Sequence, residues 1–342
     1  MQQTADPLLI WGAGAIGGTI GAYLVRKGHA VVFVDIVPEH VQAIRTAGLK
    51  IEGPVDNFSV TAPAFAPGEL TGRYARIVLA VKAHHTRGAA EALKPFLTED
   101  GYVLSAQNGL NEIEISAVVG APRTIGAFVN FGADYLGPGV VTYAGHGAVV
   151  LGELDGKSTP RLAALHALLR DFEPAAIVTD NIWGYLWGKL AYGAMLFATA
   201  LTNESICACL GDPQYFSLYR AIGQEITAIA HAKGIRPEGF NGFDPAAYAP
   251  GAGEAAARRS AADMVAHNAT STKTHSGIWR DLAVRKRKTE VDAQIAIIAE
   301  EAARIGRAAP LVRRLVELIH DIEDGRRPLA RENLDLLVQA IA

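Results

Sequence analysis

LLIWGAGAIGG, at residues 8–18, is the stretch that decides the fold. Its apolar beginning, Pro7–Trp11, predicts a buried strand, and the glycines follow in the spacing G-x-G-x-x-G. In such a loop, Gly12 permits a tight turn, Gly14 lets a pyrophosphate approach the backbone, and Gly17 lets the next helix pack closely. The stretch therefore predicts a dinucleotide site, with a chance match or a lost site as the alternative.

The residues after the loop supply the rest of a β–α–β unit. A helix is expected over Thr19–Lys27 and a second buried strand over Ala30–Val34. The free N–H groups and the positive end of that helix would hold a diphosphate. We expect cofactor contacts from the whole loop, which comprises Gly12, Ala13, Gly14, Ala15, Ile16 and Gly17.

The residue that ends the second strand indicates which dinucleotide binds. Asp35 lies 18 residues after Gly17. An acidic side chain there accepts hydrogen bonds from the adenosine ribose and would repel the 2′-phosphate of NADP. A solvated turn carboxylate ahead of Pro38 is the alternative. We expect NAD as the cofactor, with NADP as the second possibility.

Composition limits the class of protein. The chain has 342 residues, 50% hydrophobic and 20% charged, with a formal net charge of −3. These values predict a globular protein without nucleic-acid or membrane partners. The longest apolar stretch, Leu190–Leu201, is too short to span a bilayer. Cys207 and Cys209 are too close for an ordinary disulfide, which indicates the cytoplasm, and no metal site is expected.

The distribution of elements predicts two domains. Strands are expected at Arg76–Val81, Tyr102–Ala106, Thr124–Val129, 140–143 and 148–151, and a loop is expected over 63–68. The pattern is helical from Ile182 onward, with one of the helices expected at Pro310–Glu323. The fold class is therefore an α/β Rossmann-type domain with a parallel sheet, followed by an all-α domain. We place the dinucleotide domain at residues 1–180 and the helical domain, for substrate and dimerisation, at residues 181–342.

Two polar side chains follow strands of the predicted sheet. Lys82 comes after Arg76–Val81, and Asn108 comes after Tyr102–Ala106. Ligands of open α/β sheets bind outside the carboxyl ends of the strands. We therefore expect Lys82 and Asn108 near the nicotinamide half of the cofactor.

The helical half holds further candidates. Lys189 lies in an apolar segment and is either a lysine whose stem covers apolar surface or a partly buried proton donor. The RKRK run at 285–288 precedes Glu290 in an expected helix, Trp279–Ile305, where a solvated face or a Glu290–Arg287 pair would explain it. His275 and Ser276 lead into that helix, Ser276 as a candidate N-cap.

Together these residues resemble the ketopantoate reductase (2-dehydropantoate 2-reductase) family. The matching pieces occur in the family's order over nearly the whole chain: GAGAIGG at 12–18, VKAHHT at 81–86, QNG at 107–109, LWGKL at 186–190 and WRDLAVRKRKTEVD at 279–292. The resemblance implies an NAD(P)H-dependent reductase of pantothenate biosynthesis that acts on a small 2-oxo acid. It also implies a homodimer, since the family often forms dimers.

The resemblance also assigns roles. It implies that Lys189 donates the proton to the carbonyl and that Glu290 contacts cofactor or substrate. Lys82 and Asn108 would line nicotinamide and substrate, and Gly132 would make a backbone contact to the cofactor.

The chain also departs from the family. Asparagines usually occur one and two turns after the catalytic lysine, where this sequence has Gly193 and Phe197. The family's paired serines correspond to Ser276 and Gly277, with His275 adjacent. We expect Gly193, Phe197, His275 and Ser276 at the substrate. Two alternatives to ketopantoate reduction follow: an NAD-dependent dehydrogenase of a sugar-derived or more apolar hydroxy acid, and a non-catalytic dinucleotide sensor.

Overall fold

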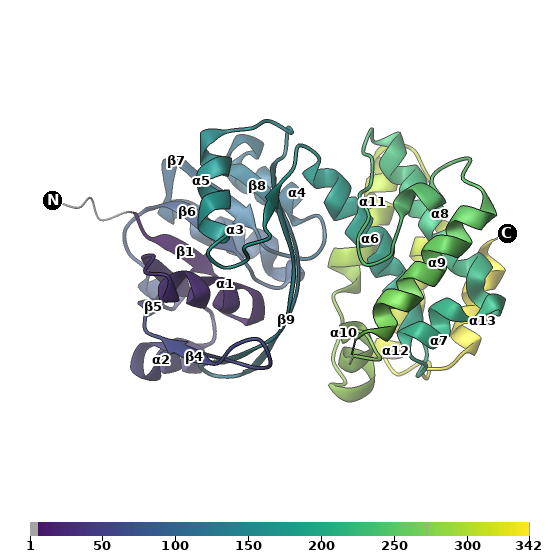
Figure 1. Cartoon of the computed structure of the whole chain (residues 1–342), viewed down its shortest axis with the longest axis horizontal. Coiled ribbons are helices and arrows are strands. Elements are labelled where there is room, and N and C mark those ends of the chain that lie inside the picture. Colours follow the sequence, from purple (N-terminus) through teal and green to yellow (C-terminus); the bar gives the residue numbers. More distant parts are fainter. Residues whose placement is uncertain (1–5, 272, 342) are drawn as a thin grey trace. The chain divides into compact units, whose positions relative to one another are not determined.

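A computed structural model describes residues 6–271 and 273–341 and divides the chain into two compact units (Figure 1). The first unit, Met1–Ile182, is built on a sheet, and the second, Trp183–Ala342, is helical. Each unit is described by itself.

The sheet of the first unit has ten strands in the order β4-β3-β9-β8-β7-β6-β1-β2-β5, with β10 paired to β9. Most pairs are parallel, whereas β3–β4 and β8–β9 are antiparallel. The strands are β1 (Leu8–Trp11), β2 (Val31–Val34), β3 (Leu49–Glu52), β4 (Phe58–Val60), β5 (Ala64–Phe65), β6 (Tyr74–Leu79), β7 (Leu97–Ser105), β8 (Thr124–Gly137), β9 (Val140–Glu153) and β10 (Ile177–Val178).

Successive residues of a strand point to opposite faces of the sheet, and in the central strands both sets are apolar. Helices therefore cover both faces. Leu8 and Ile10 of β1 face a core shared with α1, α2 and α5, whereas Leu9 and Trp11 face a second core shared with α3 and α4. The helices are α1 (Ala15–Arg26), α2 (Pro38–Ala47), α3 (Thr86–Leu93), α4 (Asn111–Val119) and α5 (Pro160–Leu169). The expected α/β Rossmann-type class is confirmed.

The sequence underestimates two parts of the sheet. Residues 140–143 and 148–151, expected as separate strands, belong to one strand, β9, which pairs with β8 along a long hairpin. The segment Pro63–Gly68, expected as loop, contains β5, whose Ala64 aligns with Phe33 of β2. Glycine and proline signal loops locally, but pairing with a distant strand overrides that signal here.

The second unit consists of helices of unequal length. They are α6 (Ile182–Thr199, whose first residue belongs to the first unit), α7 (Ile206–Gly211), α8 (Phe216–Ala232), α9 (Glu254–Ala269), α10 (Gly277–Trp279), α11 (Ile297–Arg304), α12 (Pro310–Glu323) and α13 (Glu332–Val338). Glu225 of α8 accepts the backbone N–H groups of Leu311 and Val312, which caps the start of α12. The C-terminal segment is tied to the end of α6 because Asn333 donates to the Leu201 carbonyl.

The single helix expected over Trp279–Ile305 is wrong. Two π-helical turns, Arg280–Val284 and Asp292–Ala296, flank an irregular segment that contains most of the RKRK run. Lys286 in this segment has φ +53°, a left-handed backbone that ends the helix. The basic residues are good helix formers locally, but tertiary contacts break the helix at this point.

Candidate functional site: a glycine loop, a sheet edge and a helical lysine

The three glycines of the loop meet different surroundings. Gly12 has φ +98°, and a Cβ there would lie 2.9 Å from the backbone of Ala80. A Cβ on Gly17 would lie 2.0 Å from the Gly12 carbonyl oxygen, so a side chain is excluded by the protein itself. By contrast, nothing lies within 4 Å of a Cβ built on Gly14. The open position at the start of α1 fits the approach of a dinucleotide pyrophosphate.

Asp35 is held at the end of β2 by two backbone groups. Its Oδ2 accepts the Ala13 N–H at 2.9 Å, and its Oδ1 accepts the Val37 N–H at 3.0 Å. An ionised carboxylate offers about four acceptor positions, so ribose hydroxyls can still donate to it. Ala13 itself is fully buried and joins the loop to β2.

The parallel register brings the predicted residues of the first unit to one edge of the sheet. Trp11 aligns with Val34 of β2 and Leu79 of β6, and Leu79 aligns with Ser105 of β7. The segments that follow these strands carry the glycine loop, Asp35, Lys82 and Asn108. The side chains of Lys82 and Asn108 are both exposed at this edge.

A buried polar network joins the two loops that carry Lys82 and Asn108. Gln107 donates through Nε2 to the Val81 carbonyl at 2.9 Å and to Thr86 Oγ1 at 2.8 Å. Thr86 Oγ1 lies 2.7 Å from Asn111 Oδ1, and Asn111 in turn donates to the Asn108 carbonyl at 2.7 Å. The network thereby fixes both loops relative to each other. Sequence reasoning missed these residues, although the polar Gln107 next to Asn108 was a signal.

Gly132 lies in β8 at an irregularity of the hairpin. It aligns with Gly145 of β9, and the register shifts on both sides of it. Such bulges redirect the backbone next to functional sites. The structure thus gives Gly132 an irregular strand backbone, while its contact to a cofactor stays a prediction.

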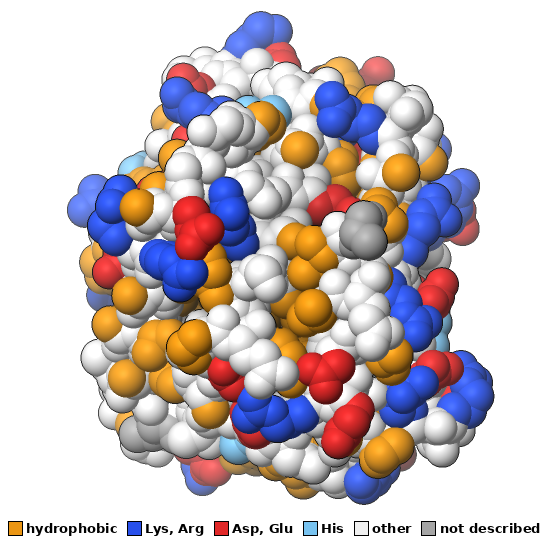
Figure 2. All heavy atoms as spheres, turned by 90° about the vertical axis from the view of Figure 1, so that its right-hand side faces the viewer, with side chains coloured by type: hydrophobic (Ala, Val, Ile, Leu, Met, Phe, Trp, Pro, Cys, Tyr) orange, Lys and Arg blue, Asp and Glu red, His pale blue; other side chains and the backbone are white. Residues whose placement is uncertain are grey.

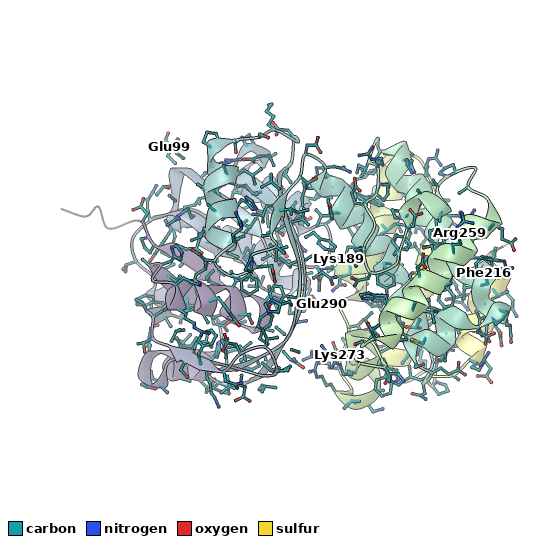
Figure 3. The ribbon with its side chains drawn as sticks, in the orientation of Figure 1. Glu99, Lys189, Phe216, Arg259, Lys273 and Glu290 are labelled. Carbon is teal, nitrogen blue, oxygen red and sulfur yellow. The ribbon has the colours of Figure 1, made fainter. Side chains whose placement is uncertain are left out.

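In the second unit, Lys189 occupies the middle of α6. Its side chain is half-buried, whereas most of the helix around it is buried. Nothing lies within 4 Å of a Cβ built on Gly193, one turn further, but Phe197 is fully buried at 1% exposure. Gly193 thus leaves room on the helix beside Lys189, while Phe197 packs into the core. Figure 3 draws Lys189 and Glu290 at one margin of the helical unit and Arg259 and Phe216 at the opposite one.

The segment that carries Glu290 is held by acidic side chains. Glu323 Oε1 of α12 accepts both the N–H and the hydroxyl of Thr289 at 2.7 Å. Arg287 pairs with Asp281 at 3.0 Å, and residues 285–290 are not helical, so the alternative of a Glu290–Arg287 pair along a helix does not apply. The half-buried Glu290 therefore follows an anchored turn rather than a helix.

His275 and Ser276 are both engaged at the start of α10. Ser276 Oγ accepts the Trp279 N–H at 3.2 Å, which confirms the expected N-cap. His275 stacks on Trp279 with ring centroids 4.1 Å apart, and its Nε2 lies 3.2 Å from the Asn203 carbonyl oxygen. These contacts give both residues structural roles, and their contact with substrate stays a prediction.

Both halves of the chain match known proteins. The model of the ketopantoate reductase PanE/ApbA family matches residues 8–156, and the model of its C-terminal domain matches residues 181–323. A 2-dehydropantoate 2-reductase of Pyrococcus horikoshii is 31% identical over 235 residues, which cover 67% of this chain and 75% of that protein. The chain belongs to the ketopantoate reductase family. It is therefore an oxidoreductase.

Solved structures share this family's fold. A PanE/ApbA family ketopantoate reductase from Ralstonia eutropha is 28% identical with a TM-score of 0.78, over 94% of this chain and 99% of that one. A D-mandelate dehydrogenase solved with NADH and anilino(oxo)acetate has a TM-score of 0.79 over 93% of this chain and 99% of that one. At 22% identity, the latter likeness shows the fold alone.

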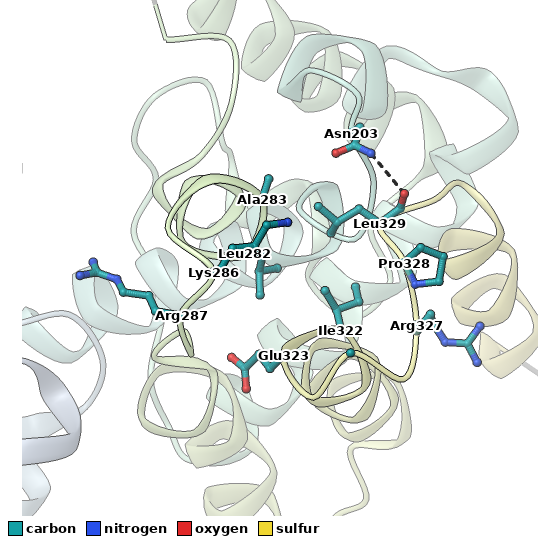
Figure 4. Close-up of a pocket in the computed structure, with 11 residues that line it drawn as sticks. Asn203, Leu282, Ala283, Lys286, Arg287, Ile322, Glu323, Arg327, Pro328 and Leu329 are labelled. Carbon is teal, nitrogen blue, oxygen red and sulfur yellow. Dashed lines mark hydrogen bonds between the residues drawn. The ribbon is translucent and has the colours of Figure 1, made fainter.

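The helical unit of this family member also has a hollow of about 500 Å³ beside the anchored turn (Figure 4). Its lining combines Lys286, Arg287 and Arg327 with Glu323 and with apolar side chains such as Leu282. Arg287 and Arg327 are paired with Asp281 and Asp321, so most of the positive charge is already neutralised. Positive and negative side chains are likewise interspersed on the face drawn in Figure 2.

The described part of the chain contains neither a membrane-spanning helix nor a cluster of metal-binding side chains. No helix among residues 6–271 and 273–341 has the length and apolar character needed to cross a bilayer. The same residues contain no group of three or more histidine, cysteine, aspartate or glutamate side chains that could hold a metal ion.

Proposed function

We propose that this chain is an NADH-dependent reductase of a small 2-oxo acid, ketopantoate or a close relative, and that Lys189 donates the proton. The observation that carries the proposal is the half-buried Lys189 beside the open position at Gly193 on a buried helix. The family's relatives named 2-dehydropantoate 2-reductase support the reaction type.

The chemistry follows from the residue types. A bound reduced nicotinamide would supply the hydride for the 2-oxo carbon, and negative charge would then develop on the carbonyl oxygen. The Lys189 ammonium stabilises that charge and transfers one proton to the oxygen, which gives the hydroxyl group and leaves a neutral amine. Solvent returns the proton to Lys189. Glu290 would hold the substrate's distal hydroxyl or keep Lys189 protonated, and Lys82 and Asn108 would orient the reactants.

The glycine loop and Asp35 would hold the dinucleotide. Gly14 leaves space for the pyrophosphate, and the N-terminal N–H groups of α1 would donate hydrogen bonds to it. Asp35 would accept the ribose hydroxyls and disfavour a 2′-phosphate, which supports NADH over NADPH.

Gly193 supports a second candidate substrate, whereas Phe197 is buried in the core and would not line the pocket. Glycine cannot make the hydrogen bonds of an amide side chain, so the pocket would be less polar than that of the family. A more apolar 2-oxo acid, such as phenylglyoxylate, is therefore the alternative to ketopantoate.

The first test is steady-state oxidation of NADH and of NADPH with ketopantoate and with phenylglyoxylate. We expect NADH to give the higher kcat/KM with the preferred acid, and a large preference for NADPH would contradict the role of Asp35. Lys189→Met should lower kcat by about 10²–10⁴ and leave NADH binding unchanged. Lys157→Met, which removes an exposed lysine paired with Asp155, is the control. Full turnover by Lys189→Met would refute the proton-donor role.

A further inference from the structure

Exposed apolar side chains occur directly after Asp35 and near the turn of the β8–β9 hairpin. Four of the eight large apolar side chains that stand exposed in the described part of the chain occur in two short segments. Ile36 and Val37 follow β2 and are 68% and 38% exposed, while Tyr135 and Leu136 near the end of β8 are 38% and 56% exposed. Apolar side chains that stay open next to a polar anchor are typical of a ligand site.

His40 joins the glycine loop to the turn of the β8–β9 hairpin. It is buried at 1% exposure, and its Nε2 lies 2.8 Å from the Ala13 carbonyl oxygen, while the Gly139 N–H donates to its Nδ1 at 2.9 Å. A carbonyl only accepts and an amide N–H only donates, so Nε2 of His40 is the donor and Nδ1 is the acceptor. One side chain therefore binds the turn of the β8–β9 hairpin to the glycine loop.

Tyr135 is placed by the same histidine. Its ring packs edge-on against the His40 ring, with centroids 5.1 Å apart at 82°. Glu39 precedes His40 in the first turn of α2, and so lies on the element whose histidine ring packs against Tyr135. Burial raises the pKa of Tyr135, and the negative charges of Asp35 and Glu39 raise it further. This corner thus combines an aromatic face, one hydroxyl donor and two negative charges.

The charges of the corner distinguish the two dinucleotides. The ribose hydroxyls of NAD can donate to Asp35 and accept from a phenol. A 2′-phosphate carries about −1.5 to −2 charges at pH 7 and would meet both carboxylates. Glu39 lies in the first turn of α2 and is exposed, so its side chain can face such a group.

We propose that Tyr135 and Glu39 complete the adenosine site: Tyr135 packs against the adenosine moiety, and Glu39 acts with Asp35 to exclude a 2′-phosphate. The inference rests on the proposed function in that it requires a dinucleotide. It adds a wall contributed by the hairpin, which lies about 100 residues from Asp35 in the sequence.

The aromatic wall is tested by calorimetric titration with ADP-ribose, which lacks the nicotinamide and needs no turnover. We expect Tyr135→Ala to weaken ADP-ribose binding about tenfold, because stacking of a base on an aromatic ring contributes on the order of 1–3 kcal/mol. Leu136→Ala removes the neighbouring exposed side chain and should stay within about twofold of wild type. Tyr135→Phe should retain most of the affinity if the ring is what packs. Equal affinities of Tyr135→Ala and wild type would overturn this part of the proposal.

The role of Glu39 is tested by titration with 2′-phospho-ADP-ribose at low ionic strength, where exposed charges are little screened. We expect Glu39→Gln to strengthen binding of this compound about three- to tenfold and to leave ADP-ribose binding unchanged. Glu99→Gln is the matched control, because it removes an exposed carboxylate near the start of β7. An unchanged ratio of the two affinities in Glu39→Gln would remove Glu39 from the proposal.

Two results distinguish the dinucleotide site itself from the contributions of Tyr135 and Glu39 to it. Wild-type protein that binds neither ADP-ribose nor its 2′-phosphate would contradict the dinucleotide site, and with it both the proposed function and this inference. Wild-type binding that no variant alters would contradict the inference alone.

Discussion

At the residue scale, substitutions of two glycines three positions apart should have different effects, one on stability and the other on cofactor binding. Gly17→Ala places a Cβ 2.0 Å from the Gly12 carbonyl and should cost at least the roughly 1–3 kcal/mol that overpacking usually costs. Gly14→Ala fills open space at a φ of −69°, so the melting temperature should stay nearly constant. NADH affinity should nevertheless fall tenfold or more, because the added methyl group occupies the pyrophosphate's approach.

Thermal unfolding followed by circular dichroism, together with NADH titration, measures both effects. A Gly14→Ala variant that melts far below wild type would show that the position serves folding and not ligand approach. The G-x-G-x-x-G spacing indicated these distinct roles from the sequence alone, because each role depends on the local turn between a strand and a helix.

At the element scale, the turn that carries Glu290 depends on α12. Glu323→Ala removes the acceptor of two Thr289 hydrogen bonds, so the turn should lose its fixed position. We expect kcat to fall about tenfold or more with NADH affinity unchanged, because small displacements of a reacting group lower rates strongly. Glu317→Ala, which removes an exposed carboxylate from the same helix, is the control. A Glu323→Ala variant with normal kcat would show that this anchor does not position Glu290.

Helix α12 could be predicted from the sequence, whereas the turn that it holds could not. Helix α12 was predicted with its exact bounds, Pro310–Glu323, because its apolar spacing and its initial proline are local signals. The break near Lys286 could not be predicted, because it depends on Glu323, which lies 34 residues after the Thr289 group that it binds. Likewise, the sheet-edge positions of Lys82 and Asn108 follow from strand order, whereas the Gln107–Thr86 bond needs the folded loops.

At the scale of the whole molecule, the corner around Asp35 is assembled over a long sequence distance. Ala13, His40 and Gly139 come from three separate segments of the first unit and meet through one imidazole. A Gly-rich stretch such as residues 132–139 carries no local sign of this meeting, so the sequence placed Asp35 but missed Tyr135. The Rossmann sequence pattern predicts the glycine loop and Asp35, but it does not predict that the β8–β9 hairpin reaches them.

The ionisation of the tyrosine side chains should make the stability of the folded protein depend on pH in the alkaline range. All ten tyrosines of the chain have a raised pKa, and burial is the first cause for each, as for Tyr23, whose pKa is raised to about 12. A pKa that is higher in the folded state than in the unfolded state contributes stability that is complete below the unfolded value, about 10. That stability is lost as the pH rises through the pKa values of the folded state.

Stability should therefore decline steeply above pH 10, and absorbance at 295 nm should show tyrosinate appearing together with the loss of circular dichroism. In urea the same phenols should titrate near pH 10. Native protein in which most phenols ionise near pH 10 with the circular dichroism intact would contradict this expectation.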